Sequence, residues 1–131
     1  MFWSLYHTAD DMRRQTWEEV VYDRARGKGL LAERADLMEE SAQKFISAAE
    51  IAFVKKFKDL DYIRNPASRA FDQMIMAGIT DPARRERTLN EAQAIADKYS
   101  KINGIPVFEE QLNIAEATKK LTLMLGAEKR D

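Results

Sequence analysis

Residues 31–52, LAERADLMEESAQKFISAAEIA, decide the fold class of this chain. Apolar residues recur here at alternating steps of four and three, which is the heptad pattern of a seam along one face of an α-helix. The seam consists of Leu31, Ala35, Met38, Ala42, Phe45, Ala49 and Ala52. The segment from about 30 to 63 contains neither Gly nor Pro, so we predict one long central helix over residues 30–63.

Start and stop signals predict four further helices. Thr8 with Asp11 fits a capping box, the pair Asn65-Pro66 and the triplet Thr80-Asp81-Pro82 are typical helix starts, and Pro106 is placed to open the last helix. The stop signals are Gly27, Gly78, Asn103-Gly104 and Gly126. The predicted ranges are about 9–26, 66–77, 82–102 and 106–125. Because the connections are short, we predict an all-α, antiparallel helical bundle of about five helices built around the long helix.

Length and composition are those of one helical domain. The 131 residues are 45% apolar and 33% charged, with five Gly and three Pro. We predict a single domain over 1–131, with an aromatic N-terminal arm at 1–8 and a frayed tail at 127–131.

Several classes of site are excluded by the residue inventory. Cysteine is absent and His7 is the only histidine, so disulfides, thiol nucleophiles, Ser-His-Asp triads and Cys/His zinc sites are not available. The net charge is −1, which provides no general attraction for nucleic acid. We expect no catalytic residue, no cofactor and no metal.

The sequence contains no recognisable targeting signal, which predicts an intracellular chain. No segment has the roughly 20 apolar residues of a membrane-spanning helix, and the start lacks the basic flank of a secretory signal. We expect no membrane insertion, and a cytoplasmic or other intracellular soluble location.

Two surfaces are candidates for binding a partner protein. Phe2, Trp3 and Tyr6 form an aromatic start that either packs on the first helix or docks into a neighbour. The alanines of the seam in residues 31–52 allow a helix to approach closely, either from a second copy of the chain or from the first helix folding back. By elimination, the leading prediction is a non-enzymatic helical subunit or adaptor that acts by protein–protein contacts within a larger assembly.

A nucleic-acid-binding regulator is the alternative. Residues 66–102 read as helix, turn and helix, and the first turn of the second helix holds Arg84, Arg85 and Arg87. Recognition side chains of helix-turn-helix proteins lie at this place. Neighbouring acidic residues, among them Asp81 and Glu86, reduce the basic character of the segment.

A metal-free helical enzyme is the third hypothesis. Residues 30–34, LLAER, with Lys44 ten residues on, resemble the first helix of the small helical chorismate mutases. Residues 81–86, DPARRE, are similar to the second charged cluster of that family. The resemblance implies an active site that contains Arg34 and Arg85. About forty residues separate Lys44 from Arg85, where the family has a short loop, and no C-terminal Gln stands at the expected place.

Overall fold

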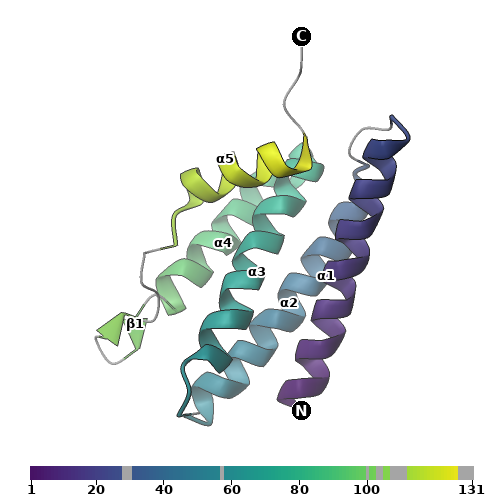
Figure 1. Cartoon of the computed structure of the whole chain (residues 1–131). Coiled ribbons are helices and arrows are strands. Elements are labelled where there is room, and N and C mark those ends of the chain that lie inside the picture. The colour runs from purple at the N-terminus through teal and green to yellow at the C-terminus, as the bar shows by residue number, and fades with distance from the viewer. Residues whose placement is uncertain (28–30, 57, 100, 103–104, 107–111, 127–131) are drawn as a thin grey trace.

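The computed structural model describes residues 1–27, 31–56, 58–99, 101–102, 105–106 and 112–126. Over these residues the chain is an all-α bundle, which confirms the predicted fold class (Figure 1). The elements are α1 (Phe2–Ala25), α2 (Glu33–Val54), α3 (Asp61–Thr80), the single-turn η1 (Pro82–Arg84), α4 (Arg85–Tyr99), β1 (Lys101–Ile102), β2 (Ile105–Pro106) and α5 (Ile114–Leu125). The two strands pair antiparallel over two residues each.

Helices α1 to α4 alternate in direction, and α5 lies across α3 at the end of the bundle opposite the N-terminus (Figure 1). Helix α2 packs against both α1 and α3, and α3 packs in turn on α4. Small residues allow this close packing, because Ala42 and Ala49 of α2 and Ala67 and Ala70 of α3 are fully buried. Helices α2 and α3 therefore form the centre of the fold.

The central helix is shorter than predicted. Helix α2 ends at Val54, and Lys56 adopts a positive φ of 52° that ends the helical path without a glycine. The next helix begins at Asp61, whose backbone N–H donates to the Asp59 carboxylate at 2.9 Å. A lysine-rich stretch after Val54 lies at the negative end of the α2 dipole, which favours ending the helix there. The single predicted helix over 30–63 is therefore two helices joined by a turn.

The first helix begins at the aromatic residues and not at Ala9. Helix α1 starts at Phe2, so residues 2–8 are its first two turns and not a separate arm. The Thr8 hydroxyl donates to the Ser4 carbonyl at 2.8 Å, four residues back, instead of capping a helix start.

Two predicted boundaries in α3 are wrong. Pro66 lies inside the helix, in its second turn, and Gly78 lies within its last turn. A proline so near a helix start removes only one intrahelical hydrogen bond. The glycine at 78 is required for packing, because a Cβ there would lie 3.2 Å from the Arg85 Cα and would overlap the Thr88 hydroxyl. Helices α3 and α4 approach closely at this point.

The fourth helix begins as predicted and ends earlier. The Asp81 side chain accepts the Ala83 N–H at 3.2 Å and caps η1, which leads into α4. Helix α4 ends at Tyr99 and not at Ile102, since Ile102 pairs with Ile105 in the small ladder. The predicted cap at Asn103-Gly104 lies outside the described residues.

The last helix starts later than predicted. Pro106 belongs to β2, and α5 begins at Ile114, where the Asn113 side chain accepts the Glu116 N–H at 3.0 Å. Gly126 ends α5 in the left-handed conformation with φ 65°, as the sequence predicts. The predicted tail at 127–131 lies outside the described residues. None of the described helices is long and apolar enough to cross a membrane.

Candidate functional site

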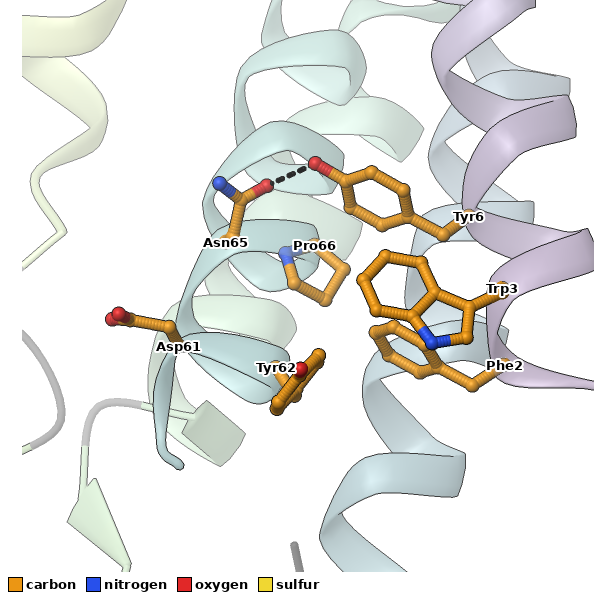
Figure 2. Close-up of a pocket in the computed structure, with 7 residues that line it drawn as sticks. All are labelled: Phe2, Trp3, Tyr6, Asp61, Tyr62, Asn65 and Pro66. Atoms are coloured by element: carbon orange, nitrogen blue, oxygen red, sulfur yellow. Dashed lines mark hydrogen bonds between the residues drawn. The ribbon is translucent and has the colours of Figure 1, made fainter. Parts of the chain in front are cut away.

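An aromatic pocket lies where the start of α1 meets the start of α3 (Figure 2). We call it the aromatic pocket, and it has a volume of about 180 Å³. It contains all three residues that the sequence proposes for an aromatic docking element. Its lining residues are Phe2, Trp3 and Tyr6 of α1 and Asp61, Tyr62, Asn65 and Pro66 of α3.

Edge-to-face contacts hold the rings of the pocket in place. The Phe2 ring centroid lies 5.1 Å from that of Trp3 and 5.5 Å from that of Tyr62, both at nearly perpendicular angles. The Trp3 and Tyr62 rings are also 5.5 Å apart and edge to face. Such pairs add stability beyond the apolar area that they bury. Phe2 anchors the group because it is only 5% exposed, whereas Trp3 is 52% exposed and forms the outer wall.

Polar groups lie at the rim of the pocket. The Tyr6 hydroxyl donates to Asn65 Oδ1 at 2.6 Å, so this bond joins α1 to α3 (Figure 2). The Asp61 carboxylate is exposed and pairs with Arg64 at 3.1 Å. Tyr6 also packs against the core, with its ring centroid 5.5 Å from that of Phe45. The pocket therefore has an apolar interior fixed to the core and a polar edge.

The pocket exists because α1 and α3 run in the same direction. Phe2 and Tyr6 are one helical turn apart on the same face of α1, and they meet Tyr62 and Asn65 on α3. The sequence predicts a helix start at Asn65-Pro66 and contains no signal that singles out Tyr62. No local pattern could pair Tyr62 with Phe2, because the contact joins residues sixty positions apart.

The seam residues are placed in the core. Helix α2 turns them toward α1 and α3, and all but Leu31, which precedes α2 and is partly buried, are fully buried. Thr16 and Val20 of α1 are buried as well, and the Ser41 hydroxyl donates to the Ala9 carbonyl at 2.8 Å. The alternative in which the first helix folds back on the seam is therefore the arrangement found. The buried seam residues are Ala35, Met38, Ala42, Phe45, Ala49 and Ala52.

The arginines proposed to read nucleic acid are largely engaged within the chain. Arg84 bonds to Asp36 at 2.8 Å, Glu39 at 3.2 Å and Asp81 at 2.9 Å. The hydrogen bond to Asp36 raises the pKa of Arg84 above its ordinary value. Arg87 bonds to both carboxylate oxygens of Glu39, at 2.7 and 2.9 Å.

Arg85 and Arg87 are both exposed, whereas Arg84 is partly buried. The ion pairs of Arg84 and Arg87 join η1 and the start of α4 to α2.

The two arginines of the mutase resemblance share no described partner. Arg34 turns toward α1 and pairs with Glu19 at 3.0 Å and Asp23 at 3.4 Å. Arg85 stands exposed at the start of α4, and no described interaction brings it near Arg34. Among the described residues, no group of three or more His, Asp or Glu side chains is placed to hold a metal ion.

Comparison with protein-family models, with curated proteins and with solved structures finds no match to this chain. The aromatic pocket is therefore a candidate functional site on the basis of its geometry alone.

Proposed function

We propose that this chain is a non-enzymatic helical subunit or adaptor, and that the aromatic pocket receives an apolar side chain from an extended segment of a partner protein. The half-exposed Trp3 in a wall of fixed rings is the observation that carries the proposal. Tryptophan and tyrosine dominate the energetic hot spots of protein interfaces.

The size and donors of the pocket favour a peptide side chain over a whole helix. A volume of about 180 Å³ accepts one apolar side chain. The Trp3 indole N–H and the Asn65 side-chain amide have no acceptor among the described residues, and both stand at the pocket (Figure 2). These donors suit the backbone carbonyls of an extended segment, as in aromatic grooves that bind such peptides.

Other exposed apolar residues extend the surface. Met1 at the start of α1 is 85% exposed and Val54 at the end of α2 is 65% exposed, and both helix ends lie at the same end of the bundle (Figure 1). Exposed apolar residues gathered in one region favour an interaction site. The buried seam of α2 offers no comparable surface, and the ion pairs of Arg84 and Arg87 give the nucleic-acid alternative less support.

The proposal is tested by cross-linking from a residue next to the pocket in the sequence. A photoreactive amino acid at Ser4, which is exposed one residue from Trp3, should capture a discrete partner when the chain is present at native abundance. Trp3→Ala should abolish this product, because it removes the outer wall of the pocket.

Tyr22→Ala is the matched control, since Tyr22 is an exposed aromatic residue on the same helix, far from the pocket. The product should persist in that variant, and circular dichroism should show equal helicity in both. A product that survives Trp3→Ala, or its absence from the original chain, overturns the proposal.

A further inference from the structure

A second hollow lies between α1, α3 and α5, and it differs in chemistry from the aromatic pocket. We call it the three-helix groove, and its volume is about 320 Å³. One side is apolar, formed by Trp17 of α1, Met76 of α3, and Leu121 and Met124 of α5. Methionine side chains adapt to apolar ligands of varied shape, and the Trp17 indole offers a large, rigid apolar surface.

The other side of the groove carries an excess of positive charge. Arg13 and Arg69 line it, and both pair with the buried carboxylate of Asp10, Arg13 at 2.9 Å. Arg14 takes the second oxygen of the same carboxylate at 3.1 Å. Three guanidinium groups share one negative charge, so N–H donors remain available for an additional anion.

Gln73 supplies a buried donor with no partner in the described part of the chain. Its side chain lines the groove, Gln73 is 1% exposed, and its Nε2 has no hydrogen-bond acceptor among the residues that the structure describes. A buried amide N–H that lacks an acceptor destabilises the folded state, because it has lost its hydrogen bonds to water. A ligand oxygen placed in the groove would satisfy it.

Asp72 lies beside these donors as a carboxyl group in low-polarity surroundings. Burial raises its pKa to about 6, against the opposing charges of Lys120 on α5 and Arg13 on α1. Its proton state therefore changes near neutral pH, and its ionised form weakens the attraction of the groove for an anion. Among the described residues, the Asp72 carboxyl accepts no hydrogen bond from Gln73 Nε2.

We infer that the three-helix groove binds a small molecule that carries a carboxylate on an apolar body, with the carboxylate held by Arg13, Arg69 and Gln73 and the body packed on Trp17 and the methionines. This site is independent of the aromatic pocket and of the proposed partner protein. A plain apolar acid and an apolar amino acid share this chemistry, and they differ in whether an ammonium group meets Asp72.

Tryptophan fluorescence provides the assay. The chain contains two tryptophans, so Trp3→Phe leaves Trp17 in the groove as the only indole. Octanoate, kept below its aggregation concentration, is the probe at pH 7. We expect a saturable change in Trp17 emission, with octanamide binding at least tenfold more weakly because it lacks the charge.

Single substitutions test whether Gln73 and Arg13 contact the carboxylate of the probe. Gln73→Leu should weaken octanoate binding at least fivefold and raise the melting temperature, since it removes the unpaired amide. Gln93→Leu, on the exposed face of α4, is the matched control and should leave binding unchanged. Arg13→Gln should also weaken binding, and Asp10 keeps Arg14 and Arg69 in that variant, so the fold is preserved.

A further variant distinguishes a plain apolar acid from an apolar amino acid as the ligand. Asp72→Asn should tighten octanoate binding, because a negative charge leaves the groove. If the natural ligand is an amino acid, 2-aminooctanoate should bind more tightly than octanoate, and Asp72→Asn should remove that advantage. No saturable signal for either probe, equal binding of octanamide, or full binding by Gln73→Leu overturns the inference.

Discussion

Asp72 should make the stability of this protein fall as the pH rises from about 4 to 7. Its folded-state pKa is raised from 3.8 to about 6 because burial disfavours the charged form. The folded state therefore holds this proton over a pH range in which the unfolded state has released it. The stabilising contribution is complete below pH 4 and is lost as the pH passes through the folded pKa.

The size of the effect follows from the two pKa values. Each unit of difference between the folded and unfolded pKa corresponds to about 1.36 kcal/mol of unfolding free energy. The change in the pKa of Asp72 from 3.8 to about 6 therefore corresponds to about 3 kcal/mol. This is an upper limit, because Asp72 keeps some contact with solvent, which screens the charge. A cost of this order is a large fraction of the stability of an ordinary domain.

The comparison of wild type with Asp72→Asn isolates this carboxyl from all others. Urea unfolding at half-unit steps between pH 4 and 8 gives the free energy of unfolding of each chain. The variant should match the wild type near pH 4 and exceed it progressively, by up to about 3 kcal/mol, at pH 7 and above.

Asp11→Asn, on the exposed face of α1, controls for the loss of one negative charge. A difference between wild type and Asp72→Asn that is flat with pH, or that changes in the opposite direction, would refute the reasoning.

Three further predictions concern the packing and capping of the bundle. Gly78→Ala should destabilise the fold by about 1–3 kcal/mol in chemical denaturation, because the added methyl meets Thr88 and the Arg85 backbone. Adding Thr88→Ala should recover part of the loss; no recovery would contradict the proposed contact. Asp81→Ala should lower the free energy of unfolding by about 1–2 kcal/mol, because it removes the cap of η1 together with the Arg84 ion pair. A melting temperature equal to that of the wild type would count against this prediction. Tyr99→Phe should lower the free energy of unfolding by about 1–2 kcal/mol, because the Tyr99 hydroxyl donates to the Glu50 carboxylate at 3.0 Å. An unchanged midpoint of unfolding would show that this hydrogen bond contributes nothing to stability.

The fold class could be predicted because it depends on local spacing. The heptad pattern of α2 and the caps at Asp81 and Gly126 act through residues within one or two turns, so they are visible in the sequence. Of the boundaries that were wrong, the one at Gly78 depends on a contact at longer range, whereas the start of α3 at Asp61 follows a local turn at Asp59. Pro66 lies within α3 because that helix begins earlier, at Asp61, and Gly78 stays helical because α4 packs against it.

The sequence predicts the α1 side of the aromatic pocket and not its α3 side. Phe2, Trp3 and Tyr6 stand out as an aromatic cluster, but whether they form an arm or a helix face depends on what they contact. The three-helix groove was not foreseen at all. Arg13, Arg69 and Gln73 each look like ordinary helix residues, and only the packing of three helices gives them a common hollow.

The sequence by itself determined that this chain forms amphipathic helices, where several of them begin and end, and which chemistries lack the necessary residues. The tertiary structure alone decided that the seam is buried within the chain, that Arg84 and Arg87 bind α2, and that the aromatic pocket and the three-helix groove form. The physical reason is range: helix periodicity and capping act over a few residues, whereas burial and charge pairing depend on which distant surfaces meet.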